Sequence, residues 1–166
     1  LFQMIARIVR VPEMVVGDVH AQVAANALGA QRVRELLTEN QWADLNGLGS
    51  EVLNRAEQAM RKAIERIPDG VYHGALTIDG FEEDLHLVAQ VTVAGSNLTI
   101  DFSGTSPQVD RGINCVLNYT MGLTLVGVKM LVDPATPING GCIRPLLITA
   151  PRATILSAEY PAPVVG

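Results

Sequence analysis

Two runs of alternating apolar and polar residues decide the fold, and together they read LHLVAQVTVAGSNLTIDF over residues 85–102. A period of two is typical of half-buried strands, and Gly95-Ser96 between the runs predicts a turn. With these two residues at the centre of the turn, the numbers of paired residues sum to 191, so Val93 faces Leu98. All apolar side chains then share one face, as a correct register requires.

A third strand precedes these runs and spans residues 72–78. Asp79-Gly80 directly after it is a strong signal for a two-residue hairpin. Paired numbers then sum to 159, which places His73 opposite His86. The sequence therefore predicts a three-stranded antiparallel meander whose apolar face must be covered. We expect a short final strand over residues 146–149.

Helical periodicity surrounds the meander. Apolar residues recur every three or four positions over residues 18–37 and 50–67, with Asp18 and Ser50 as the expected N-caps. Residues 113–132 are apolar nearly all round, and Lys129 is their only charge. Because this segment carries several polar residues and no basic anchors, we expect a buried core helix rather than a membrane span. The predicted fold class is α+β, an antiparallel meander packed with two amphipathic helices and one buried apolar helix.

Composition limits the function. The net charge is −5 and no basic patch occurs, so the sequence argues against nucleic-acid binding. Cys115 and Cys142 match no metal or redox pair and indicate reduced thiols in a cytoplasmic protein. We expect a single internal segment, residues 1–166, of a larger subunit. Its helical part covers residues 14–67, and the meander with the buried helix covers residues 70–150.

Two polar groups could carry chemistry. In the 159 register, His73 and His86 oppose one another near Asp84, which could bind Zn²⁺ or Mn²⁺ or could be an ordinary solvated sheet face. The string from Asp101 to Gln108 could present acceptors to a ligand, or its hydroxyls could satisfy local amides in a turn.

Several strings resemble the hydantoinase B/oxoprolinase family. The most specific is Asp-Phe-Ser-Gly-Thr-Ser-Pro-Gln-Val at residues 101–109, with Gly-Ile-Asn-Cys at residues 112–115 behind it. The other similar strings are Gly17–Asn26, Arg32–Leu37, Pro68–Tyr72 and Gly141–Pro145. The resemblance implies ATP-dependent opening of a cyclic amide such as a hydantoin, 5-oxoproline or a related lactam.

The resemblance also implies a division of labour. A hydantoinase A-like partner subunit or domain would bind ATP and phosphorylate the amide oxygen, and a divalent metal bound outside this chain would activate water. Asp101, Ser103 and Asn114 are then the candidates to line the substrate cavity, and the segment alone would be inactive. A segment of an acetone- or acetophenone-type carboxylase and a non-catalytic assembly module remain as alternatives.

Overall fold

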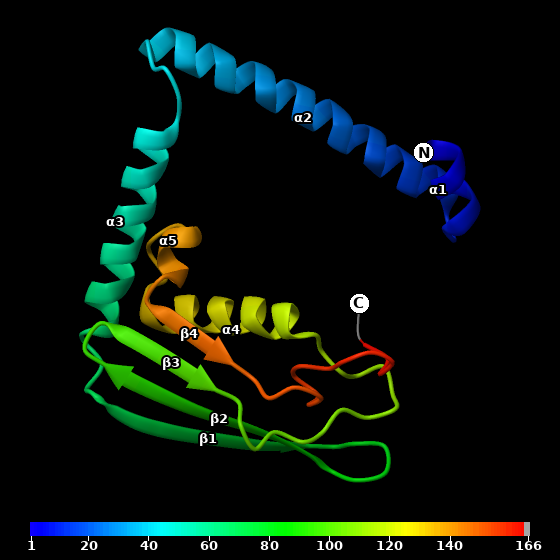
Figure 1. Cartoon of the computed structure of the whole chain (residues 1–166), viewed down its shortest axis with the longest axis vertical. Coiled ribbons are helices and arrows are strands. Elements are labelled where there is room, and N and C mark those ends of the chain that lie inside the picture. The colour runs from blue at the N-terminus through cyan, green and yellow to red at the C-terminus, as the bar shows by residue number, and fades with distance from the viewer. Residues whose placement is uncertain (165–166) are drawn as a thin grey trace. The chain divides into compact units, whose positions relative to one another are not determined.

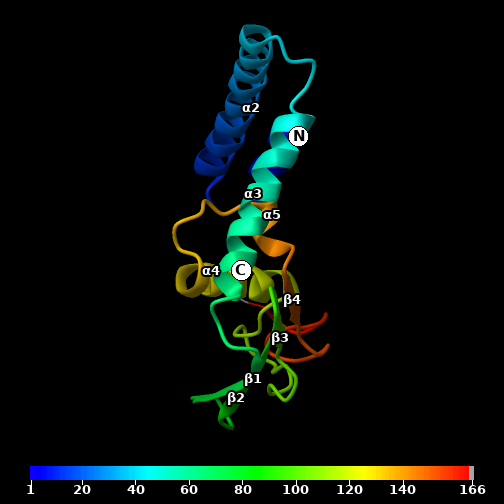
Figure 2. The same ribbon diagram turned by 90° about the vertical axis from the view of Figure 1, so that its left-hand side faces the viewer.

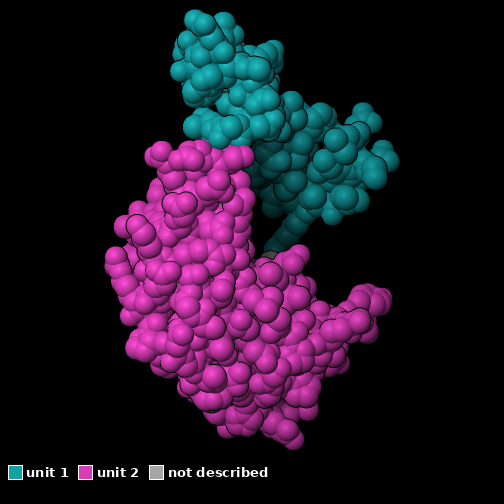
Figure 3. Space-filling model, turned by 60° about the vertical axis from the view of Figure 1, so that its left-hand side comes forward, with its two compact units in different colours: residues 1–49 teal, residues 50–166 magenta. Residues whose placement is uncertain are grey.

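The computed structural model describes residues 1–164, and the chain divides into two compact units, residues 1–49 and the remainder from residue 50 (Figure 3). The first unit contains α1 (Phe2–Ile8) and α2 (Pro12–Asn40). The ring of Phe2 meets that of His20 edge to face, with centroids 4.3 Å apart. The helix predicted over residues 18–37 is longer than expected, because Pro12 at its first turn suits a helix start. Asp18 is therefore an interior residue and no N-cap.

Helix α3 (Asn46–Ile64) begins four residues earlier than predicted. The carboxylate of Asp44 accepts a hydrogen bond from the backbone N–H of Asn46 at 2.8 Å, which satisfies one free amide of the first turn. Ser50 consequently lies inside the helix. Its buried stripe consists of Ala56, Met60 and Ile64, spaced by four residues as one helix face requires.

The sheet has four strands in the order β1-β2-β3-β4 (Figure 1). They are β1 (Gly70–Ile78), β2 (Leu85–Ala94), β3 (Asn97–Asp101) and β4 (Leu146–Thr149). The first three form the predicted antiparallel meander, and β4 joins β3 in parallel. The α+β prediction is confirmed.

The register of the second hairpin is as predicted, with Val93 opposite Leu98. The register predicted for the first hairpin is wrong by four residues, because Ile78 pairs with Leu85 instead of Phe81. Residues 79–84 form a six-residue loop, which keeps three consecutive carboxylates, Glu82 to Asp84, out of the ladder. An even shift leaves every side chain on the same face, so the apolar pattern fits both registers equally well.

Helix α4 (Leu117–Val132) lies on one side of the sheet (Figures 1 and 2). Its partly buried residues Met121, Val128 and Val132 pack against the core. The opposite face is open, and Met130 and Leu131 are 70% and 87% exposed. The prediction of a buried helix is therefore met on one face of α4, whereas the other face is exposed within this chain. No helix in the described part of the chain is long and apolar enough to cross a membrane.

The core lies between α3, the sheet and the short α5 (Gly140–Ile143). It consists of Ala56, Met60, Ile64, Val93, Leu98, Ile100, Cys142 and Ile148. Two buried polar side chains accompany it on α4. Thr120 donates to the carbonyl of Leu156 at 2.7 Å, and Lys129 forms an ion pair with Asp133 at 2.9 Å. Each buried polar group thus has a partner, as a stable interior requires.

Candidate functional site

The loop after β3 completes an edge of the sheet. Strand β3 pairs with residues 90–94 of β2. The part of β2 that precedes residue 90 is paired instead by Thr105 and Ser106. The hydroxyl of Thr105 accepts from the N–H of Val88 at 3.0 Å and donates to its carbonyl at 3.2 Å. Ser106 bonds both backbone groups of His86, each at 2.8 Å. The hydroxyls of the Asp-Phe-Ser-Gly-Thr-Ser string therefore stabilise the sheet directly.

Asn114 fixes the segment that follows this loop. Its side chain is fully buried, and its Oδ1 accepts from the N–H of Val109 at 2.9 Å. Its Nδ2 donates to the carbonyls of Val109, Arg111 and Pro163 at 2.7, 2.9 and 2.7 Å. Both N–H groups are thus engaged by backbone. In the structure Asn114 holds residues 109–111 in place, and its predicted place beside a substrate cavity stays a prediction.

Asp101 and Ser103 form a small polar cluster at the end of β3. Asp101 Oδ1 accepts from the N–H and hydroxyl of Ser103 at 3.1 and 2.9 Å, and from the hydroxyl of Thr149 at 3.2 Å. The hydrogen bonds from Ser103 lower the pKa of the Asp101 carboxyl, although desolvation acts in the opposite direction. Asp101 is therefore ionised at neutral pH and can accept hydrogen bonds from a ligand.

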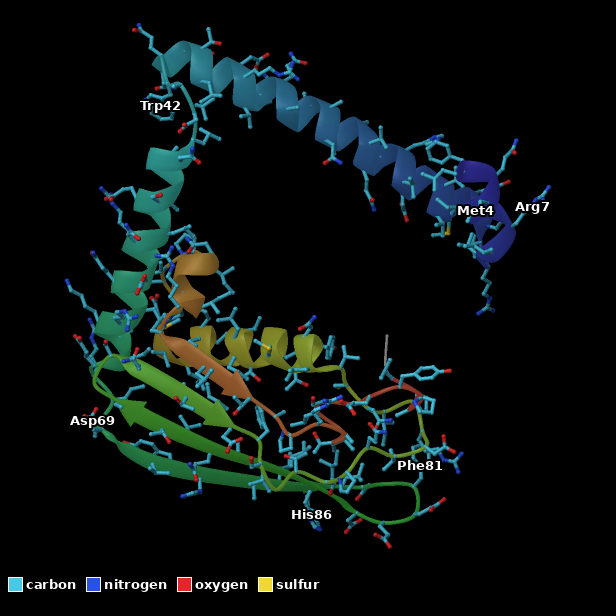
Figure 4. The ribbon with its side chains drawn as sticks, in the orientation of Figure 1. Met4, Arg7, Trp42, Asp69, Phe81 and His86 are labelled. Carbon is cyan, nitrogen blue, oxygen red and sulfur yellow. The ribbon has the colours of Figure 1, made fainter. Side chains whose placement is uncertain are left out.

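A cavity of about 360 Å³ lies between two loops, residues 79–84 and 106–113. Its charged lining residues are Glu82, Glu83, Asp84, Asp110 and Arg111. The guanidinium of Arg111 lies 5.5 Å from the ring centroid of Phe81, which is labelled in Figure 4, so the two lining residues are in cation–π contact. None of the three predicted substrate-lining residues lines this cavity.

The hairpin predicted from the sequence contains no such cavity. A two-residue turn at Asp79-Gly80 leaves no loop to form its wall, whereas the six-residue loop does. The carboxylates at residues 82–84 were the available signal, because such residues are unfavourable within a strand.

The predicted histidine pair does not form. His73 is paired with Gln90, and His86 with Thr77, whose hydroxyl lies 3.0 Å from the His86 Nδ1. The two histidines share the outer face but lie four ladder positions apart, about 13 Å along the strand. Figure 4 shows His86 pointing away from the helices. Among residues 1–164, no three His, Cys, Asp or Glu side chains are arranged to hold a metal ion, so this donor set does not fit a cation.

The chain is similar to known proteins along its whole length. The family model of hydantoinase B/oxoprolinase matches residues 1–166. The B-type component of a putative D-/L-hydantoinase from Pseudomonas sp. (strain NS671) is 37% identical, over 95% of this chain and 29% of that protein. The 5-oxoprolinase of Saccharomyces cerevisiae is 30% identical, over 91% of this chain and 12% of that protein. The chain therefore spans less than a third of the length of these relatives.

Solved structures share the fold. The ATP-dependent caprolactamase of Pseudomonas jessenii superposes with a TM-score of 0.83 at 26% identity, covering 95% of this chain and 28% of that one. Acetone carboxylase in its nucleotide-free form gives a TM-score of 0.58 at 15% identity, over 66% of this chain and 16% of that one. The second likeness concerns the fold alone. The family model over residues 1–166 shows that the chain belongs to the hydantoinase B/oxoprolinase family.

Proposed function

We propose that the chain is an internal segment of the B-type part of an enzyme that opens a cyclic amide at the expense of ATP. The likeness to caprolactamase supports this proposal, because it covers 95% of this chain with a TM-score of 0.83. The ring is a hydantoin, 5-oxoproline or a related lactam. An A-type partner subunit or domain binds ATP and phosphorylates the amide oxygen.

Phosphorylation overcomes the low reactivity of the substrate. An unstrained amide is a poor electrophile, and phosphate on its oxygen activates the carbonyl carbon. Water attacks that carbon and the C–N bond breaks, which leaves an acyl phosphate on the opened chain. A second water hydrolyses the acyl phosphate, so that the products are the ring-opened carboxylic acid, ADP and phosphate. A divalent cation, which we assign to residues outside this chain, would supply the Lewis acidity for the water.

Within this chain we assign substrate contact to Asp101, with Ser103 as the residue that orients it. Ser103 and Thr149 engage only one carboxylate oxygen, so the other is available to the amide N–H of a ring. An ionised acceptor forms a stronger bond to such a donor than a neutral one does. Asn114 has a supporting role only.

The test uses the full B-type polypeptide that contains residues 1–166 together with its A-type partner. ADP release and ring-opened product are measured with hydantoin, 5-oxoproline and caprolactam, and each of the two polypeptides is omitted in turn. We expect product only when both polypeptides and ATP are present. Turnover without ATP, or product formation only with acetone and bicarbonate, would contradict the proposal.

The assignment of Asp101 has its own variant. Asp101→Asn keeps the shape and removes the charge, and we expect kcat/KM to fall at least about tenfold, or 1.4 kcal/mol. Asp79→Asn is the matched control, because Asp79 is an exposed loop residue and its replacement makes the same change in charge. Equal kcat/KM in both variants and in the unmodified enzyme would remove Asp101 from the site.

A further inference from the structure

Strand β1 forms one edge of the sheet. Within residues 1–164 its strand partner is β2, on one side only, and Figure 1 shows it as the outermost strand. Eight of its nine residues, Val71 to Ile78, are exposed. A strand edge of this length presents a row of backbone donors and acceptors that can pair with another strand.

The hydrogen bonds of β2 identify which groups of β1 form that row. The backbone groups of His86 and Val88 bond to residues 105 and 106. The backbone N–H and C=O groups of the even-numbered residues of β2 therefore point away from β1. In an antiparallel strand, alternate residues bond to opposite sides. The odd-numbered residues of β2 therefore bond to β1, and they face its even-numbered residues. The N–H and C=O groups of residues 71, 73, 75 and 77 point outward.

Nothing in β1 protects this edge. Proteins usually shield an exposed edge with charged residues, proline or a bulge, whereas β1 reads GVYHGALTI and pairs without interruption. Its inward-facing side chains are also open, with Tyr72 and Leu76 44% and 58% exposed. Beside them lies an apolar groove of about 420 Å³, lined by Gly74, Leu76, Leu87, Ala89, Tyr119 and Leu123 among others.

We propose that a β-strand from the B-type polypeptide outside residues 1–166 adds to the free edge of β1 and that its apolar side chains cover the groove. The length of the relatives favours this occupant, because the chain spans 29% of the similar hydantoinase polypeptide and most of such a polypeptide lies outside it. The uncharged edge also favours a permanent partner over one that dissociates. The inference rests on the proposed function only for the existence of the longer polypeptide.

Hydrogen exchange in that polypeptide tests the pairing residue by residue. The amides of residues 72, 74, 76 and 78 bond to β2 and serve as the internal control. We expect the amides of residues 71, 73, 75 and 77 to exchange at least about 100-fold more slowly than in an unstructured peptide. Fast exchange of the odd-numbered set beside a protected even-numbered set would overturn the proposal.

A proline variant tests the same edge through stability. Ala75→Pro removes one outward N–H and no bond to β2, and proline is tolerated in an edge strand whose N–H faces solvent. We expect Ala75→Pro to lower the Tm of the full polypeptide by at least about 2 °C, whereas Ala75→Val, which keeps the N–H, does not. Equal Tm values for the two variants would show a free edge.

An experimental structure of the full polypeptide identifies the occupant. A strand of the same polypeptide beside β1 supports the proposal. A strand from a second copy or from the A-type partner would overturn it, as would solvent along the edge. None of these readouts depends on turnover, so failure of the catalytic proposal would be recognised separately.

Discussion

Replacing Asn114 with aspartate separates a structural role from a role in substrate binding. The variant Asn114→Asp keeps the size and one acceptor but removes both N–H donors. A carboxylate would then face the three carbonyls of Val109, Arg111 and Pro163, which lie 2.7–2.9 Å from Nδ2 in the native protein. A typical hydrogen bond contributes about 1 kcal/mol net. Loss of three donor contacts therefore costs about 3 kcal/mol, and the unpaired buried carbonyls add to it.

The assay combines the Tm of the full B-type polypeptide with hydrogen exchange at the amide of Val109, which donates to Asn114 Oδ1. Asn118→Asp is the matched control, because Asn118 is exposed on α4 and such a change costs within about 0.5 kcal/mol. We expect Asn114→Asp to lower Tm and to speed exchange at Val109, and the control to do neither. Unchanged Tm and unchanged exchange together with a reduced kcat/KM would show instead that Asn114 contacts the substrate.

Three further predictions concern the polar groups of the second unit. Thr105→Val leaves both backbone groups of Val88 without a partner and should lower the free energy of unfolding by about 2–3 kcal/mol. Thr105→Ser keeps a hydroxyl and should lower it less. Equal denaturant midpoints for the two variants would contradict this prediction. Lys129→Ala leaves Asp133 unpaired in the interior and should lower the free energy of unfolding by about 3–5 kcal/mol. Lys62→Ala is the exposed control. A smaller loss of stability in Lys129→Ala than in this control would show that the ion pair is unimportant. Burial alone would raise the pKa of Asp133, but hydrogen bonds from Lys129 and Thr136 outweigh it and lower the pKa. A lowered pKa gives stability that is present above the unfolded-state value near 4 and lost as pH falls further, so Tm should drop below about pH 4, less steeply in Asp133→Asn.

Much of the fold follows from local patterns. The alternation over residues 85–102 and the turn at Gly95 fix the second hairpin, because Gly95 adopts a φ of 58° that side chains rarely tolerate. Helix α3 also carries salt bridges between residues four positions apart, with Glu51–Arg55 at 2.6 Å. These features depend on residues close together in sequence, which is why pattern analysis finds them.

The failures concern choices that local patterns leave open. Two registers of the first hairpin place the same side chains on the same faces, and the sequence signal at Asp79-Gly80 favours the shorter loop. Gly80 is required for another reason, since a Cβ there would lie 1.9 Å from the carbonyl oxygen of Glu83. The wrong register produced the histidine pair and concealed the cavity.

The candidate site shows the same limit. A string such as Asp-Phe-Ser-Gly-Thr-Ser identifies the family, but its spacing does not reveal what each side chain contacts. Thr105 and Asn114 bond to backbone groups of residues 88, 109, 111 and 163, and those contacts depend on the whole loop arrangement. Asp101 and Ser103 form a polar cluster at the end of β3, and their role in binding a ligand stays a prediction.

We propose that this chain scaffolds a reaction whose bond-breaking groups lie outside it. The most direct measurement incubates the 166-residue chain with the A-type partner, ATP and a lactam that the full B-type polypeptide opens, and quantifies the ring-opened amino acid. We predict no product above a control without the chain, and full activity when the complete B-type polypeptide replaces it. Ring opening by residues 1–166 with the partner alone would contradict the account.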